Sequence, residues 1–197
     1  MFKLRGVKQP LIVSWYYKKR SNMGFEYFKK KKWIEITREE RLFSAYLYFS
    51  IKENEGKFIS WLNQKLGYEK YNPSGTWEVG YEVCLYRDYL KFFKEKRTAK
   101  FSRKRTFDLC LFSEKNIIII EAKVQQAFKN KQVDDIVKDK IMIPSLLGTK
   151  DLNIDIVALC SSKYINSKSK VFEKFDMSIS WQELSELYYN NIFSHAD

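Results

Sequence analysis

The sequence predicts an α/β fold in which a mixed central sheet is flanked by helices. Amphipathic stretches with apolar residues at helical spacing alternate along the 197 residues with short apolar runs bounded by polar residues. With 45% hydrophobic and 17% aromatic residues, the chain can form a packed core, and its length suits one domain. We therefore expect a single domain over residues 1–197. Its core covers about 37–160, preceded by a basic and aromatic extension over 1–36 and followed by a strand and helix over 175–190.

Within the core, the elements are expected in the order α, β, β, β, α, β. Thr37-Arg38-Glu39-Glu40 has the Thr-x-x-Glu form of a capping box and predicts the start of the first helix. Two later apolar runs, 106–112 and 117–124, are typical of strands buried on both faces. The full set of expected elements is helices over 38–53 and 57–66, strands over 77–86, 106–112 and 117–124, a helix over 127–143, strands over 154–160 and 177–179, and a helix over 181–189.

The histidine and cysteine content narrows the chemistry. The one histidine, His195, lies in a polar C-terminal tail and is expected to be solvated, which disfavours histidine triads, histidine-ligated zinc and histidine general bases. Cys84, Cys110 and Cys160 lie far apart in apolar runs, so we expect buried thiols rather than disulfides or metal ligands. No apolar run approaches the roughly 18 residues that cross a bilayer. We expect a soluble, cytoplasmic protein without a membrane partner.

The formal net charge of +12 is concentrated in two windows. Residues 18–32 hold seven Lys or Arg and one Glu, and residues 91–105 hold eight and one. Both windows are interleaved with aromatic residues, which favours binding of a polyanion such as nucleic acid. Solvated loops or an anionic membrane surface are the alternatives. The candidates for nucleic-acid contacts are Lys29, Lys30, Lys31, Lys32, Lys100, Arg103, Lys104 and Arg105.

A tight hairpin is expected at 113–116, and its register brings charged residues together. With Glu114 and Lys115 at the turn, Asp108 lies opposite Glu121, about 4.5–5.5 Å away between Cβ atoms. Lys123 follows two residues later on the same face. Two carboxylates this close repel each other unless a cation lies between them, and Mg²⁺ is a cation that prefers such oxygen ligands. The alternative is a buried salt-bridge cluster with no further function.

At these residues the sequence resembles a known family. Thr106-Phe107-Asp108, followed after twelve residues by Glu121-Ala122-Lys123, is similar to the PD-(D/E)XK nuclease motif. The resemblance extends to the element order over about 37–160 and departs at Phe107, where the motif often has Pro. It implies a restriction-endonuclease-like αβββαβ core and Mg²⁺-dependent hydrolysis of phosphodiester bonds, with Mn²⁺ able to substitute.

The resemblance also implies roles for the matched residues. Asp108 and Glu121 would hold the metal, the Ala122 carbonyl could add a ligand, and Lys123 would orient or activate the attacking water. Related nucleases often add a glutamate from the first helix, which matches Glu40, although the capping box explains that residue equally well.

Two further residues have both a functional and a structural interpretation. Glu82, on the polar face of the preceding strand, competes with Glu40 as a ligand and is otherwise an ordinary solvent-facing residue. Gln132 matches a glutamine that some family members place near the site and is otherwise a surface residue. Gln125 and Gln126 either contact the substrate backbone or end the strand.

The expected function is therefore a metal-dependent endonuclease of the restriction or repair type, with DNA favoured over RNA as the substrate. Cutting both strands of a duplex would suggest a homodimer. The alternatives are a nucleic-acid-binding module that keeps the nuclease fold without cleavage, and a membrane-surface or scaffold protein that uses only its basic windows.

Overall fold

The structure is a computed structural model that describes residues 24–95, 101–102, 104–149, 151–167 and 169–197. The chain divides into two compact units, Met1–Thr37 and Arg38–Asp197. In the described part of the first unit, a 3₁₀ turn, η1 (Glu26–Phe28), precedes a one-turn helix, α2 (Trp33–Ile36). Phe25 stacks on Tyr27 there, with ring centroids 5.2 Å apart, and both side chains are exposed.

The second unit is built on a five-stranded mixed sheet whose strands are ordered as in the sequence. The first three strands pair antiparallel and the last three pair parallel. The central strands are apolar on both faces because helices cover both sides of the sheet. The strands are β1 (Glu78–Val83), β2 (Phe107–Phe112), β3 (Asn116–Ala122), β4 (Asn153–Cys160) and β5 (Met177–Ser180).

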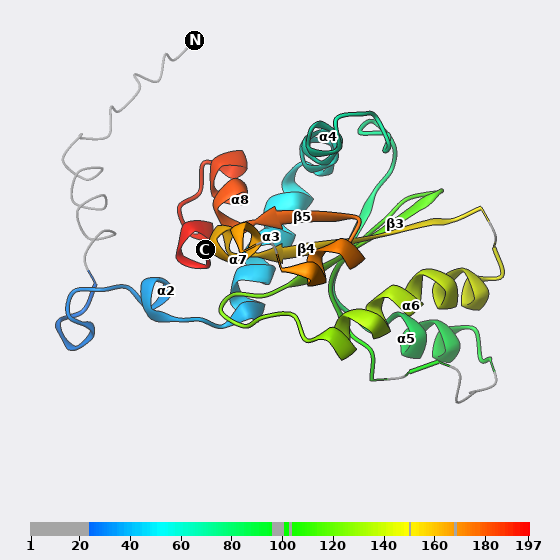
Figure 1. Ribbon diagram of the computed structural model, residues 1–197, viewed down its shortest axis with the longest axis horizontal. Coiled ribbons are helices and arrows are strands. Elements are labelled where there is room, and N and C mark those ends of the chain that lie inside the picture. Colours follow the sequence, from blue (N-terminus) through cyan, green and yellow to red (C-terminus); the bar gives the residue numbers. More distant parts are fainter. Residues whose placement is uncertain (1–23, 96–100, 103, 150, 168) are drawn as a thin grey trace, which may run out of the picture. The chain divides into compact units, whose positions relative to one another are not determined.

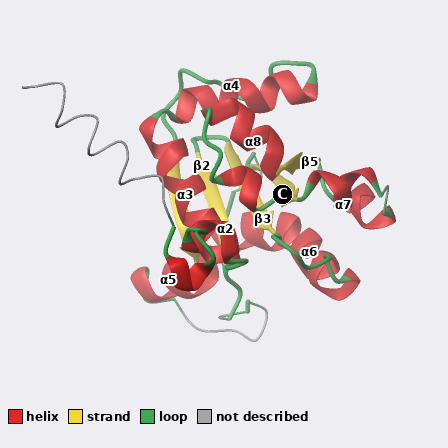
Figure 2. Cartoon of the chain, turned by 90° about the vertical axis from the view of Figure 1, so that its left-hand side faces the viewer, coloured by secondary structure: helices red, strands yellow, loops and turns green. Residues whose placement is uncertain are grey.

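Helices flank this sheet on both sides, which confirms the expected α/β class. Figures 1 and 2 show α3, α4 and α8 on one side of the strands and α5 and α6 on the other. The helices are α3 (Glu40–Glu53), α4 (Glu55–Leu66), α5 (Leu85–Phe92), α6 (Asn130–Leu147), α7 (Ser162–Asn166) and α8 (Trp181–Tyr188), with 3₁₀ turns η2 (Lys170–Lys174) and η3 (Phe193–His195). None of these described helices is long and apolar enough to cross a membrane.

The prediction of one strand over 77–86 was wrong at its C-terminal end. The chain leaves the sheet after Val83 and forms α5, so a helix is inserted between the first two strands of the expected order. Tyr86 and Leu90, four residues apart, are buried on the inner face of this helix. Cys84 therefore precedes a helix rather than lying within a strand, and its Sγ is 3.2 Å from Thr106 Oγ1. All three thiols are buried and free, as expected.

The expected capping box at Thr37 was also wrong. Glu39 is the N-cap of α3, and the helix begins at Glu40, whereas Thr37 is the C-cap of α2. The Glu40 carboxylate, on the first residue of this helix, forms an ion pair with Lys123. The interpretation of Glu40 as a capping residue therefore fails.

The C-terminal tail packs against the fold instead of being solvated. Phe193 is fully buried and stacks on Trp181, with ring centroids 6.1 Å apart and an interplanar angle of 18°. Ala196 is buried as well. His195 lies between them and is half-buried, and its carbonyl accepts a hydrogen bond of 3.1 Å from Arg38 Nη1. The apolar residues at 193 and 196 are what the interpretation as a polar tail overlooked.

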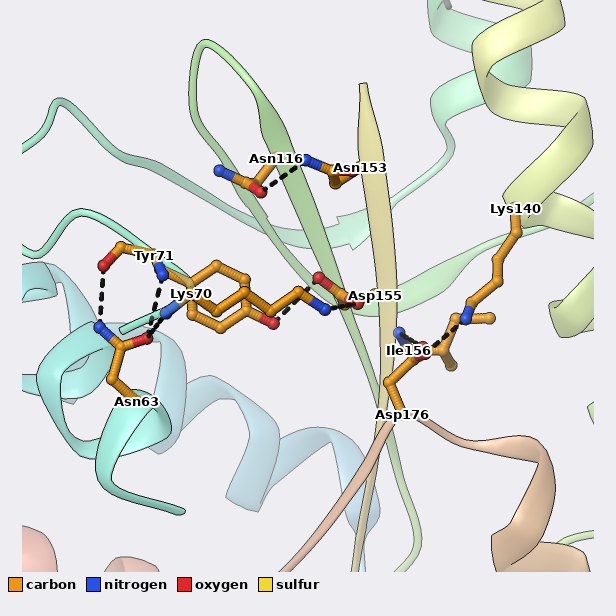
Figure 3. A network of polar contacts seen from close by, with 9 residues as sticks. All are labelled: Asn63, Lys70, Tyr71, Asn116, Lys140, Asn153, Asp155, Ile156 and Asp176. Atoms are coloured by element: carbon orange, nitrogen blue, oxygen red, sulfur yellow. Dashed lines mark hydrogen bonds and ion pairs between the residues drawn. The ribbon is translucent and has the colours of Figure 1, made fainter. Parts of the chain in front are cut away.

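A buried polar network attaches the loop after α4 to the sheet (Figure 3). Asp155, buried on β4, accepts hydrogen bonds from Lys70 Nζ at 2.6 Å and from the Tyr71 hydroxyl at 3.0 Å. The Asn63 side chain pairs with both backbone groups of Tyr71, at 2.8 and 3.0 Å. Both oxygens of this buried carboxylate therefore have a partner.

Candidate active site

The β2–β3 hairpin has the register that the sequence predicted. Leu109 pairs with Ile120 and Cys110 with Ile119, and the turn is closed by a 2.9 Å hydrogen bond from Ser113 N to Asn116 O. Asp108 and Glu121 come directly outside the pair of Leu109 and Ile120, and the charge of Asp108 acts on Glu121. The hairpin therefore brings the two carboxylates to its open end, as expected.

The two carboxylates have unequal surroundings. Asp108 Oδ2 accepts a hydrogen bond of 2.7 Å from Ala122 N. Glu121 is only 5% exposed, and its Oε1 accepts a hydrogen bond of 2.5 Å from Gln132 Nε2. Its other oxygen, Oε2, is buried without a hydrogen-bond partner in the described part of the chain. A buried unpaired carboxylate oxygen costs free energy, so it requires an explanation beyond stability.

Lys123 is the cation at the centre of this cluster. Its Nζ donates to Glu40 Oε1 at 3.2 Å and to the Ala122 carbonyl at 2.5 Å, and it lies 3.9 Å from Glu121 Oε1. The side chain is only 9% exposed. One buried ammonium thus interacts with three carboxylates, because the charge of Lys123 also acts on Asp108.

The backbone of Lys123 is held from two other elements. Its N–H donates to the Leu159 carbonyl on β4 at 2.7 Å, and its carbonyl accepts from Trp181 Nε1 at the start of α8 at 2.9 Å. Trp181 was not predicted to belong to the site, because no local pattern links residues that are 58 positions apart. These bonds fix the segment that follows β3.

The carboxyl groups of the site are shifted toward their protonated forms. Burial, followed by the charge of Asp108, raises the pKa of Glu121 to about 7. Burial also raises the pKa of Asp108, against the hydrogen bond from Ala122 N and the charge of Lys123. For Glu40, burial raises the pKa and Lys123 opposes the rise. Burial is the largest cause of all three shifts, the charge of Arg105 opposes it at Asp108 and Glu121, and a further cation would favour the charged forms.

Of the remaining candidates, the structure brings two to the carboxylate cluster and places the third elsewhere. Gln132, from α6, is in contact with Glu121, and Glu40 joins the cluster through Lys123. Glu82 instead lies 3.4 Å from Arg41 Nε, in a left-handed backbone conformation with φ of 52°. Within the described ranges, no group of three or more His, Cys, Asp or Glu side chains is placed so that it could hold a metal ion.

The basic candidates are distributed over different parts of the chain. Lys29, Lys30, Lys31 and Lys32 belong to the first unit, and Lys100 and Arg103 lie outside the described residues. Lys104 is exposed. Arg105 is mostly buried, because its Nε pairs with Asp139 Oδ2 at 3.0 Å.

Asp139 was not singled out from the sequence, although a signal was present. It lies on the inner face of α6, between Ile136 and Ile143, where an apolar residue would be expected. Tyr86 donates to its Oδ1 at 2.5 Å, and Arg105 occupies the other oxygen. An acidic residue on an apolar helical face indicates a buried partner.

Comparison with known proteins does not extend this description. No family model matches the chain, and neither curated proteins nor solved structures include a match.

Proposed function

We propose that this protein is a metal-dependent nuclease with a restriction-endonuclease-like core, which hydrolyses phosphodiester bonds in DNA. The observation that carries the proposal is the buried Oε2 of Glu121, which has no partner among the described residues and lies near Asp108 and Lys123. In most structural salt bridges both oxygens of the carboxylate have partners. An oxygen that is kept free among other carboxylates fits a hard cation as its ligand.

The donor set suits Mg²⁺, with Mn²⁺ as a substitute. Asp108 and Glu121 would hold the ion, with waters and substrate phosphate oxygens completing its coordination. Glu40 and the Ala122 carbonyl, which accept hydrogen bonds from Lys123 in this structure, would add oxygen ligands only after releasing that ammonium. When bound, the ion would supply a Lewis acid and a water of lowered pKa.

Other groups of the chain would orient the site residues and stabilise the charge that develops on the substrate. Gln132 holds Glu121 in its orientation, and the Trp181 indole holds the backbone of Lys123. The Lys123 ammonium would stabilise negative charge that develops on the phosphate oxygens during hydrolysis. None of these roles requires a histidine, in agreement with the single, remote His195.

A plasmid-nicking assay tests the proposal. Supercoiled DNA is incubated with wild type, Asp108→Asn and Asp151→Asn in Mg²⁺ and in EDTA. Asp151 is the matched control, because it is exposed just before β4, at the turn end of the β2–β3 hairpin. We expect nicking by wild type and Asp151→Asn in Mg²⁺ only, and its loss in Asp108→Asn. Equal nicking by all three proteins, or none by any, would overturn the proposal.

The ion pair between Lys123 and Glu40 favours a second candidate, a nucleic-acid-binding module without cleavage. In that case the cluster would be structural. The module would bind DNA with strong salt dependence, and neither Mg²⁺ nor Asp108→Asn would change the affinity. Calorimetric titration with Mn²⁺ separates the two candidates, since only the nuclease requires an ion-binding site that Asp108→Asn weakens.

A further inference from the structure

A pocket of about 300 Å³ lies directly beside Lys123, at the carboxyl ends of the parallel strands β3 and β4. Sheets of this kind commonly bind ligands at that end. The volume is at the lower limit of the roughly 300–1,000 Å³ that is typical of small-molecule sites. Its polar lining comes from the segment after β3 and from α7, and includes Lys123, Gln125, Gln126, Ser161, Lys163 and Tyr164.

The two glutamines give this pocket groups that can both donate and accept hydrogen bonds. Gln125 and Gln126 are exposed, and their amides have no side-chain hydrogen bond within the described residues. Lys163 is also exposed and has no ion-pair partner in that part of the chain. A site built for phosphate alone would present mainly cations, whereas paired amides match the mixed donors and acceptors on the edge of a nucleobase.

An aromatic cluster, in which Tyr164 packs against both Phe128 and Phe172, connects the pocket to Lys123. Tyr164 lines the pocket and stacks on Phe128, with ring centroids 6.1 Å apart and an interplanar angle of 23°. Its hydroxyl accepts a hydrogen bond from Phe128 N, which fixes the ring. The Lys123 ammonium lies 5.7 Å from the centroid of Phe128. A base held at Tyr164 would therefore belong to a nucleotide next to the phosphate at Lys123.

We propose that this pocket binds one unpaired nucleobase of the substrate strand, so that the substrate is single-stranded or locally opened nucleic acid. Bases stack on aromatic side chains and offer their edges to amides only when they leave a duplex. This inference rests on the proposed function, because it places the pocket beside the scissile phosphate.

Two ligands of equal charge test the proposal. Fluorescence anisotropy in EDTA compares a short single-stranded oligodeoxynucleotide of mixed sequence with a strand of the same length made of abasic nucleotides. We expect wild type to bind the strand with bases about tenfold more tightly, because stacking of one base contributes on this scale. Equal affinity for the two strands would overturn the proposal.

Substitutions in the pocket test whether these residues cause the preference for the strand with bases. The double variant Gln125→Ala/Gln126→Ala should reduce the preference about threefold and leave the affinity for the abasic strand unchanged. Lys163→Ala should weaken both strands equally, since its ammonium would contact phosphate. Gln64→Ala, an exposed glutamine on α4, is the matched control. An unchanged preference in the double variant would place the base elsewhere and overturn the assignment.

The outcomes for the pocket and for the nuclease are separable. If wild type nicks plasmid but binds the two strands equally, the nuclease proposal is retained and the pocket assignment fails. If no DNA is cut but the base preference exists and depends on the two glutamines, the catalytic proposal fails and the pocket belongs to a binding module.

Discussion

Two buried carboxylates on neighbouring parallel strands, Asp155 on β4 and Glu121 on β3, differ in how their oxygens are satisfied. Asp155 is 4% exposed and both of its oxygens accept hydrogen bonds, from Lys70 and Tyr71. Glu121 is 5% exposed, and one of its oxygens has no partner in the described chain. Burial is therefore alike, and the hydrogen-bond partners differ.

The difference separates a group that serves stability from one that is available to a ligand. Burial lowers the pKa of Lys70, but its hydrogen bond with Asp155 and that residue's charge raise it overall, as expected for a satisfied pair. Around Glu121, burial and the neighbouring Asp108 together disfavour the charged form. The first region should respond to substitution with lost stability, and the second with lost activity.

The largest expected effect is on catalysis, in Lys123→Met. This change removes the one ammonium of the cluster while keeping an unbranched side chain of similar length. We expect plasmid nicking to fall about 100–1,000-fold, as when one electrostatic stabiliser of a transition state is removed. The measurement is the initial nicking rate in Mg²⁺, with thermal unfolding as the check of folding. A loss smaller than threefold would contradict a catalytic role for Lys123.

The second prediction concerns the satisfied region. Asp155→Ala leaves the Tyr71 hydroxyl and the partly buried Lys70 ammonium without their acceptor. We expect the free energy of unfolding in urea to fall by about 3 kcal/mol, the scale for breaking a buried ion pair. Nicking activity per folded molecule should stay near that of wild type. Full stability together with lost activity would reverse the roles assigned to the two regions.

The third prediction uses the raised pKa of Glu121. Because the folded value of about 7 exceeds the ordinary 4.5, the unfolded chain loses its proton first as the pH rises. The loss of folding stability caused by Glu121 is absent below about pH 4.5, grows up to about pH 7, and is then constant. The difference of 7 − 4.5 = 2.5 pH units corresponds to at most about 3 kcal/mol.

Glu121→Gln cannot ionise and should lack this penalty. We expect the variant to gain stability over wild type between pH 4.5 and 7, measured by urea unfolding across that range, while losing nicking activity. Mg²⁺ should stabilise wild type and not the variant, because the proposed ion site requires the Glu121 carboxylate. Parallel stability curves for the two proteins would show that the carboxyl group carries no such penalty.

The local sequence pattern was sufficient to predict the strands of the sheet and the hairpin that carries Asp108 and Glu121. The hairpin register followed from the turn at Glu114 and Lys115 together with the two apolar runs, because alternation allows only one face to be polar at the open end. The convergence of Asp108, Glu121 and Lys123 follows from that register. These features depend on contacts close in sequence.

Features that depend on distant contacts were only partly predicted: the resemblance named Glu40 as a candidate for the site, but no local pattern linked it to Lys123. The approach of Glu40 to Lys123 joins residues 83 positions apart, and a capping-box pattern gave a competing local explanation. The inserted helix α5 was hidden because the apolar alternation of β1 continues through Leu85, where helical and strand periods coincide over a short run. Tertiary packing decided both cases.

The smallest effect is expected at Gln132, which orients Glu121 without belonging to the carboxylate cluster. Gln132→Leu keeps the size of the side chain and removes the amide that donates to Glu121 Oε1. We expect nicking to fall about 10–100-fold, the range for groups that position metal ligands. Raising the Mg²⁺ concentration should recover part of the rate, because a poorly oriented carboxylate binds the ion more weakly.

The neighbouring Lys131→Ala, exposed on the same helix, is the control and should keep the wild-type rate. Rescue by Mg²⁺ is the informative result, since a purely structural role of Gln132 would lower the rate equally at every Mg²⁺ concentration. A rate that falls without any rescue would remove Gln132 from the ion site. In that case the free oxygen of Glu121 would be oriented by its strand alone.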